Sequence, residues 1–225
     1  MSPVTSSHVV SVNVGAPRVV EWFARHVTTA IWKQPVSGPV RIAGVNLDGD
    51  DQADRRVHGG PEKAVYAYAA EDYAWWSQQL DTDVMPGTFG ENLTFAGVDL
   101  HACAVGEKCQ VGTAQLRVTE PRLPCFKLGI RMGDAAFVDR FADAGRFGAY
   151  LAIDSPGSIA AGDEVHRLEL RDDVLTIAQF IRAAQDGDPE LLERLASHPL
   201  VSDAWRQHAW RALKRKERST WTSPT

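Results

Sequence analysis

Short apolar segments separated by turn-forming residues dominate the first 170 residues, and this pattern limits the folds open to the chain. Val9–Val14 alternates large apolar side chains with small or polar ones, as a strand with one buried face does. Glycine, proline, asparagine and aspartate recur between such segments, for example in LDGDDQAD, MPGTFG and SPGSIAAGD. Many short strands at this spacing favour a closed barrel or a sandwich over a doubly wound parallel sheet. The further strands that we expect are Arg18–Phe23, Thr29–Trp32, Val40–Val45, Ala64–Tyr68, Asn92–Phe95, Lys108–Val111, Ala114–Thr119, Ala149–Ile153 and Glu164–Leu170.

Helical periodicity interrupts this part twice and replaces it after about Arg171. Asp134–Ala144 brings three apolar side chains onto one face, and Glu71–Leu80 starts with acidic residues, as helices do. Three further helices are expected from Asp173 or Thr176 to Asp186, from Asp188 to Ser197, and from Leu200 to about Lys216. We therefore predict a β-rich domain over residues 1–170 and a helical module over residues 171–225.

Charge is unevenly distributed along the chain. The 24 Lys and Arg residues against 29 Asp and Glu give a net charge of −5, which argues against a protein that coats nucleic acid. Six basic residues and one acidic residue lie between Arg206 and Arg218, so this segment carries +5 and the remainder −10. Tryptophans stand among these basic residues, a mixture that single-strand binding uses. Because Trp205, Ala209 and Leu213 recur at helical spacing, we favour a packed helix with a solvated basic face. Docking of an acidic electron-transfer partner on that face is an alternative.

The cysteines and the N-terminus indicate the compartment. Cys103, Cys109 and Cys125 form no CxxC pair, and their odd number leaves a free thiol under any pairing. The N-terminal segment lacks the basic and apolar regions of a signal peptide, and no apolar run approaches the ~20 residues needed to cross a bilayer. We therefore expect a cytoplasmic protein with reduced cysteines and no membrane partner.

Cys125 lies in the segment that points most clearly to chemistry, Thr119–Leu128. Two prolines in this segment favour a stiff, extended arch that delivers the cysteine at its end. Arg122 precedes the cysteine by three residues and Lys127 follows it by two. Cations near a thiol lower its pKa and make the sulfur a nucleophile or a ligand for a soft metal. A small, buried and inert cysteine is the alternative, which we expect for the other two cysteines because they lack such neighbours.

A second candidate segment combines His58 with Gly59, Gly60 and Lys63. Adjacent glycines let backbone amides approach an anion closely, so the segment suits a phosphate or another anionic group. It matches neither a Walker loop nor a GxGxxG fingerprint. An ordinary turn followed by a solvated lysine is the alternative.

Asn92 marks a third candidate, at the point where the turn PGTFGE enters a predicted strand. Its amide offers a donor and an acceptor, which suits an amide-bearing heterocycle and equally suits the backbone of the turn itself.

In this order and spacing, HGGPEKAVYAY, PGTFGENLT and PRLPCFKL resemble the MOSC domain, the C-terminal domain of molybdenum cofactor sulfurases. DQAD, YAWW, AAGD and HPLVSDAWR are similar to its YiiM-like branch, and the resemblance extends from about Thr29 to Trp210. It implies a mainly β fold, a closed β-barrel of the pyruvate-kinase insert type, followed by a small all-α module of three helices. One departure is GAYLAIDSPG, where Ala152 and Ile153 stand in place of the Arg-Val expected in relatives.

The resemblance also implies that the chain binds a molybdenum cofactor, a phosphorylated pterin that carries the metal. Cys125 is then expected to be the thiolate ligand of molybdenum, and His58 a proton donor in catalysis. The residues expected to hold or line the cofactor are Arg122, Thr119, Lys63, Gly59, Gly60 and, toward the pterin, Asn92.

Members of this branch resemble reductases of N-hydroxylated compounds such as hydroxylaminopurines and amidoximes. The chain has no flavin or nicotinamide fingerprint and no ferredoxin-type run of cysteines, so we expect electrons from a separate flavin or iron–sulfur reductase. The alternative is a carrier of the cofactor, or of sulfur as a Cys125 persulfide, without reductase turnover. A homodimer that uses the helical module as its surface is a further expectation.

Overall fold

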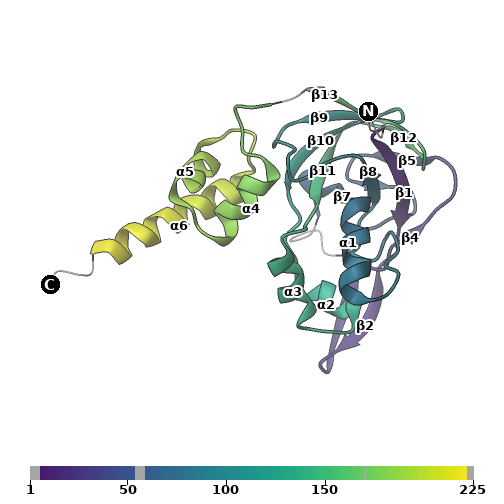
Figure 1. Ribbon diagram of the computed structural model, residues 1–225, viewed down its shortest axis with the longest axis horizontal. Coiled ribbons are helices and arrows are strands. Elements are labelled where there is room, and N and C mark those ends of the chain that lie inside the picture. Colours follow the sequence, from purple (N-terminus) through teal and green to yellow (C-terminus); the bar gives the residue numbers. More distant parts are fainter. Residues whose placement is uncertain (1–5, 54–58, 170, 222–225) are drawn as a thin grey trace.

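The computed structural model describes residues 6–53, 59–169 and 171–221, and an eight-stranded sheet forms its centre (Figure 1). The strands follow the order β13, β9, β10, β11, β7, β8, β1 and β4. Only β7 and β8 form a parallel pair in this sheet of the described residues. A parallel pair needs a crossover connection, which α1 (Ala70–Leu80) supplies. The strand bounds are β1 (His8–Val14), β4 (Gln34–Pro35), β7 (Val65–Ala69), β8 (Leu93–Ala96), β9 (Lys108–Val111), β10 (Ala114–Pro121), β11 (Ala149–Ser155) and β13 (Val165–Glu169).

β13 at one end of this sheet approaches β1, the strand next to the other end, without a strand ladder between them. An isolated antiparallel bridge links His8 of β1 to Glu164, just before β13, and the Val9 backbone N–H donates to the Asp163 carbonyl at 2.9 Å. The predicted closed barrel is not confirmed. An isolated bridge in place of a strand ladder joins β1 to the segment before β13, and β4 continues the sheet beyond β1. The fold is also mixed α/β rather than mainly β, since six α-helices accompany the strands in the described residues.

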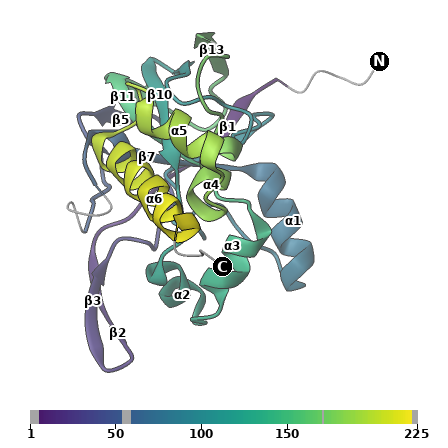
Figure 2. The same cartoon turned by 90° about the vertical axis from the view of Figure 1, so that its left-hand side faces the viewer.

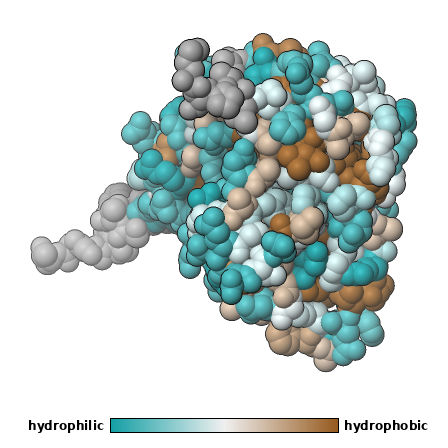
Figure 3. Space-filling view, turned by 45° about the vertical axis from the view of Figure 1, so that its right-hand side comes forward, coloured by the Kyte–Doolittle hydropathy of each residue, from teal (hydrophilic) through white to brown (hydrophobic). Residues whose placement is uncertain are grey.

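A two-stranded ribbon of β2 (Arg18–Trp22) and β3 (Arg25–Thr29) projects from the body (Figures 1 and 2). Phe23 and Ala24 form its turn with φ of 47° and 58°, the positive φ values that a two-residue hairpin turn requires. Phe23 is 75% exposed, and apolar surface gathers at this end of the molecule (Figure 3). The predicted strand Thr29–Trp32 is wrong. β3 pairs with β2 over Arg25–Thr29, so it ends where the predicted strand begins, and the chain leaves the ribbon there. A three-stranded sheet has the order β12 (Gly157–Ile159), β5 (Val40–Ala43) and β6 (Asn46–Leu47).

Aromatic side chains pack α1 and α3 (Phe137–Ala144) together over the sheet. The fully buried rings of Trp76 and Phe141 stack at a centroid distance of 5.5 Å. The Trp76 indole N–H donates to the Tyr68 hydroxyl at 2.9 Å, so the buried donor is satisfied. Burying each such ring contributes about 1.5–3 kcal/mol, and this contact therefore holds both helices against the strands that form the site.

Three helices follow β13 and pack against one another beside the sheet (Figure 2). They are α4 (Ile177–Gln185), α5 (Pro189–Ser197) and α6 (Asp203–Trp221). Thr176 and Gln179 form a capping box at the start of α4, and Pro189 occupies the first turn of α5 as predicted. The division into two domains near residue 170 stays a prediction. None of the helices in the described ranges is long and apolar enough to span a membrane.

Two glycines at helix and strand ends give a test of the packing around β11. Gly148 has φ of 67°, and a Cβ on it would lie 2.3 Å from the Ala67 carbonyl oxygen of β7. Gly145 has φ of 66° with no atom near such a Cβ. Gly145→Ala is expected to cost about 1–2 kcal/mol from its backbone conformation alone. Gly148→Ala is expected to cost clearly more, because it also pushes β11 away from β7. Urea unfolding of the two variants measures the difference, and equal costs would show that the close approach is unimportant.

Candidate functional site

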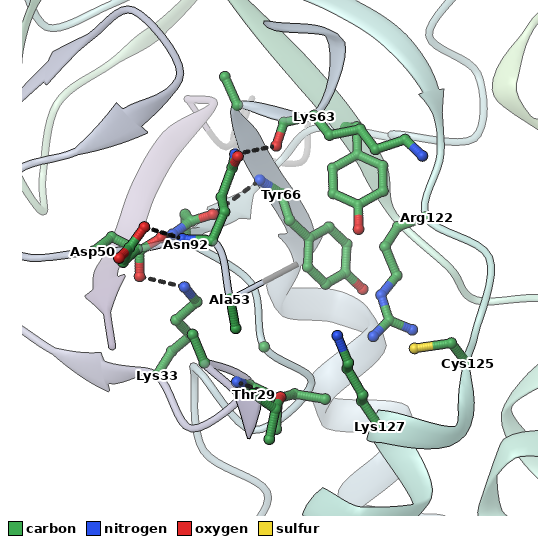
Figure 4. A pocket seen from close by; sticks show the side chains of 17 residues that line it. Thr29, Lys33, Asp50, Ala53, Lys63, Tyr66, Asn92, Arg122, Cys125 and Lys127 are labelled. Atoms are coloured by element: carbon green, nitrogen blue, oxygen red, sulfur yellow. Dashed lines mark hydrogen bonds and ion pairs between the residues drawn. The ribbon is translucent and has the colours of Figure 1, made fainter. Parts of the chain in front are cut away.

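A pocket with an empty volume of about 610 Å³ lies between segments that are far apart in the sequence (Figure 4). This volume includes space that is open to solvent, so the pocket is an open-sided cleft. The lining side chains carry both charges and come from the end of β3, the loop after β6, β7, β11 and the arch before α2 (Phe126–Met132). They are Thr29, Ala30, Ile31, Lys33, Asp50, Asp51, Gln52, Ala53, Lys63, Ala64, Tyr66, Gly90, Asn92, Arg122, Cys125, Lys127 and Tyr150.

Cys125 lies at one end of this pocket, directly before α2, a helix that the sequence analysis did not predict. Its backbone is extended, with φ of −137° and ψ of 168°, and the chain turns into the helix at the next residue. Cys125 is partly exposed, whereas Cys103 and Cys109 are buried. Burial raises the pKa of each of those two thiols to about 12, so they stay protonated at neutral pH. Among the three, Cys125 is the cysteine whose sulfur can meet a ligand in the pocket.

Arg122 places a buried cation beside Cys125 (Figure 4). Its guanidinium lies 5.4 Å from the centre of the Tyr66 ring, and the Tyr150 hydroxyl lies within its electrostatic reach. Its Nη1 atom is buried and has no hydrogen-bond partner in the part of the chain that the structure describes. A buried donor without a partner costs free energy, so this atom is available to an anionic or acceptor group in the pocket.

Two lysines add positive charge to the same pocket. Lys127, in the first turn of α2, reaches toward Arg122 and the Cys125 thiol (Figure 4). Lys63 ends the short 3₁₀ helix η1 (Pro61–Lys63), and its Nζ lies 3.3 Å from Glu120 Oε1. Arg122 and Lys127 together favour the thiolate form of a nearby cysteine and suit a ligand with several negative charges.

The rings of Tyr66 and Tyr150 form an aromatic wall next to these cations. Their centroids lie 5.7 Å apart, and burial raises the pKa of both hydroxyls, that of Tyr150 to about 12. Both side chains are therefore neutral at pH 7. They offer a flat surface and hydroxyl groups, with no charge that would oppose an anionic ligand.

An ion pair that the sequence analysis missed lies on another side of the pocket (Figure 4). The Lys33 ammonium donates to the Asp50 carboxylate, and the two side chains are only 7% and 3% exposed. Burial lowers the pKa of Lys33, and the charge of Asp50 opposes this shift. The Gly15 backbone N–H also donates to Asp50, at 2.8 Å. The two charged residues stand 17 positions apart, Lys33 just after a predicted strand and Asp50 in a predicted turn, so no local pattern could pair them.

Asn92 lines the pocket and holds this ion pair in place. Its Nδ2 donates to Asp50 Oδ2 at 2.9 Å and to the Asn13 carbonyl at 3.3 Å, and its Oδ1 accepts from the Tyr66 backbone N–H at 3.1 Å. These bonds use both amide hydrogens of Asn92. The geometry therefore gives Asn92 a supporting role for Asp50, and the expected contact with a pterin stays a prediction.

Several predicted site residues lie elsewhere. The Thr119 hydroxyl faces the Glu62 and Tyr150 carbonyls at 2.6 and 3.0 Å, behind the pocket wall, so it is committed to backbone oxygens. Gly60 precedes η1, and its N–H donates to the Gln52 side chain at 3.2 Å. Neither Gly59 nor Gly60 is among the lining residues that the structure describes. His58 lies outside the described residues, so its expected role as a proton donor stays a prediction.

Comparisons with known proteins show which family this chain resembles. Residues 54–166 match the MOSC domain. The chain is 32% identical to the uncharacterized protein YflK of Bacillus subtilis (strain 168) over 213 residues, which cover 93% of this chain and 95% of that protein. It is 30% identical to protein YiiM of Escherichia coli (strain K12) over 182 residues, 79% of this chain and 81% of that protein.

Two further similarities concern a solved structure and a larger protein. The crystal structure of YiiM from Geobacillus stearothermophilus superposes with a TM-score of 0.76 at 28% identity, covering 92% of this chain and 99% of that one. A protein named reductase from Gibberella moniliformis (strain M3125 / FGSC 7600) is 33% identical over 164 residues, which are 70% of this chain and 29% of that protein.

Breaking the Lys33–Asp50 pair tests its place in the pocket wall. Lys33→Met leaves the Asp50 carboxylate buried without its counter-ion, which is expected to lower the free energy of unfolding by about 3–5 kcal/mol. Adding Asp50→Asn removes the stranded charge and is expected to restore much of that loss. Urea unfolding measures both, and a double variant as unstable as Lys33→Met would contradict this account.

Proposed function

The chain belongs to the MOSC domain family, and we propose that it binds a molybdenum cofactor and reduces N-hydroxylated compounds with it. The observation that carries this proposal is the buried Arg122 guanidinium, whose Nη1 finds no partner among the described residues, next to a partly exposed thiol. An anionic cofactor that also bears a soft metal supplies what both groups need: an acceptor for the guanidinium and a metal for the sulfur.

Each residue at this end of the pocket has a role in the proposal. Cys125, as the thiolate, ligates molybdenum, while Arg122 and Lys127 hold anionic groups of the cofactor. Lys63 adds positive charge at the pocket edge, where Glu120 fixes its position. The cofactor, when bound, supplies two-electron redox chemistry that no side chain has. The neutral tyrosine wall accepts flat rings, and Asn92 acts by holding Asp50.

The proposed substrate class follows from the resemblance to the YiiM-like branch of the family. Reduction of an N–OH group consumes two electrons and two protons, breaks the N–O bond, and yields an N–H group and water. A separate flavin or iron–sulfur reductase donates the electrons. The fungal relative named reductase is consistent with an oxidoreductase role, and the free cysteines fit a cytoplasmic location.

The metal content of two cysteine variants tests the ligand. The protein is produced in a host that makes the cofactor, and molybdenum is counted by elemental mass spectrometry. The parent and Cys109→Ala are expected to carry about one molybdenum per chain. Cys125→Ala is expected to carry at least tenfold less, because the two remaining cysteines are buried and cannot replace Cys125 as the ligand. Equal metal in Cys125→Ala and the parent would remove Cys125 as the ligand. A parent protein without molybdenum would overturn the cofactor proposal.

Arg122 gives a second test of cofactor binding. Arg122→Gln removes a charge-assisted hydrogen bond worth about 1.5–3 kcal/mol, so retained molybdenum after dialysis is expected to fall by about tenfold or more. Arg140→Gln is the matched control, because Arg140 is exposed on α3 and donates to the Gln79 carbonyl far from the lining residues. A similar loss in both variants would mean that the effect is not specific to the pocket.

Turnover separates the proposed enzyme from the carrier alternative. Protein loaded with molybdenum is mixed with benzamidoxime or 6-hydroxylaminopurine and a chemically reduced viologen dye, and the amine product is measured. Product formation that depends on Cys125 supports the reductase. Stoichiometric molybdenum without product supports a carrier, in which Cys125 is then examined for a persulfide.

A further inference from the structure

The outer face of α6 carries an exposed tryptophan. On the inner face Trp205, Ala209 and Leu213 pack against the hydrophobic core, as their spacing predicts. Trp210 follows Ala209 by one position and is 54% exposed, so it lies outside this packing. A single exposed apolar side chain is ordinary on a protein surface. What Trp210 can bind is therefore decided by the side chains around it.

Three cations surround this tryptophan. Arg211, Lys214 and Arg215 are exposed, and with Trp210 they line an open hollow on the surface, the α6 hollow. At 3.6 residues per turn, the four side chains share about 140° of the outer face of the helix. The Lys214 ammonium lies 4.0 Å from the centre of the Trp210 ring. Within the part of the chain that the structure describes, no acidic side chain lines this hollow.

The cations of the α6 hollow differ from their neighbours on the same helix in having no counter-charge. Arg206 pairs with Asp203, and Lys216 donates to a backbone carbonyl. No ion pair of the described residues involves the three cations of the hollow, and Arg211 has a neutral partner, Gln207, at 3.4 Å. Adjacent positive charges without a counter-charge raise the local concentration of anions, so the α6 hollow favours an anionic ligand.

An anionic ligand with exposed flat rings uses every side chain of the hollow. In a single nucleic-acid strand the phosphates pair with cations and the bases stack on aromatic rings, and strand-binding proteins combine these two contacts. A duplex covers the faces of its bases, so it offers the Trp210 ring little to stack on. A membrane surface requires an apolar helix face that can insert, and the apolar face of α6 is already packed against the core.

An acidic electron-transfer partner on this face is less favoured. α6 extends away from the sheet whose strands line the pocket, and no residue of the α6 hollow lines that pocket (Figure 1). Electrons tunnel efficiently only over short distances, so a donor of electrons to the pocket gains nothing from a seat on α6. The exposed tryptophan also has no role in a contact made by charge alone.

We propose that the α6 hollow binds single-stranded nucleic acid, with Trp210 stacked on a base and the three cations on phosphates. A local patch of this kind is compatible with the net charge of −5, which argues only against a protein that coats nucleic acid. The acidic remainder of the chain is screened beyond about 8 Å at physiological salt. The proposal does not rest on the pocket or on its cofactor.

Binding is measured with the full chain, without cofactor, and a fluorescein-labelled thymidine strand of about 15 nucleotides. Fluorescence anisotropy is expected to give a Kd of about 1–100 µM at about 50 mM salt. Three neutralised phosphates predict a slope of about −2 for log K against log salt concentration, so about 200 mM salt is expected to weaken binding about 15–20-fold. A parent protein that does not bind the strand at the lower salt concentration would overturn the proposal.

Two variants separate stacking from charge. Trp210→Leu is expected to weaken binding about fivefold or more and to leave the salt slope unchanged. Lys214→Gln combined with Arg215→Gln is expected to flatten the slope by about 1.4, because two phosphate contacts are lost. Phe23→Leu, at an exposed ring of the ribbon, and Arg140→Gln, at an exposed cation of α3, are the matched controls and are expected to bind as the parent does. All these side chains are exposed, so unchanged melting temperatures check that each variant is folded.

Competition against the labelled strand decides the occupant. Unlabelled single strand is expected to displace it at a concentration about fivefold or more below that needed of a duplex of equal length or of polyglutamate. Equal competition by the duplex would mean attraction by charge alone, and equal competition by polyglutamate would point to an acidic protein. Either result overturns the proposal, as would a Trp210→Leu variant that binds like the parent. None of these measurements involves molybdenum, so they leave the proposed function untouched.

Discussion

The burial of charge organises this molecule around its pocket. Lys33, Asp50, Glu91, Glu120 and Arg122 all lose nearly all contact with water. Each needs partners, and the partners of two of them come from distant segments: Gly15 and Asn92 for Asp50, and Lys63 for Glu120. A stranded charge in such a place costs several kcal/mol, so the strands and helices that bring the partners together are held to one arrangement. Within the described residues, Arg122 Nη1 and Glu91 Oε2 both remain without a hydrogen-bond partner, and of these two residues Arg122 lines the pocket.

Local patterns in the sequence predict most of the helices and strands of this fold, but they predict less well which segments pair with one another. Strands such as His8–Val14 and Lys108–Val111 follow from alternation and turn residues, and the three C-terminal helices follow from their helical periodicity and the turn residues between them. The ribbon was misread at Thr29–Trp32, because pairing with β2 outweighs the local apolar run. The sequence analysis does not predict α2, because the prolines before Cys125 favour an extended chain. The chain is extended only up to Cys125, and the helix begins at the next residue.

The site shows the same division between local and long-range information. Cys125, Arg122, Lys63 and Asn92 meet at one pocket, as the motifs suggested. Thr119, Gly59 and Gly60 are not among its lining residues, and the Lys33–Asp50 pair was not foreseen. Motif spacing identifies segments that approach a site, but hydrogen bonding decides which atoms of those segments remain available to a ligand. Asn92 illustrates this, since its amide is already engaged by three protein groups.

The order of the strands also determines when the pocket can exist during synthesis. β11 lies between β10 and β7 in the sheet, although it comes late in the chain, and Tyr150 of this strand completes the aromatic wall. Contacts between such distant segments form only after the intervening chain has been made, and the loops must close before the contacts stabilise them. A nascent chain that ends before β11 therefore has no pocket to offer. Any ligand of this site is loaded onto a polypeptide in which β11 has already been made.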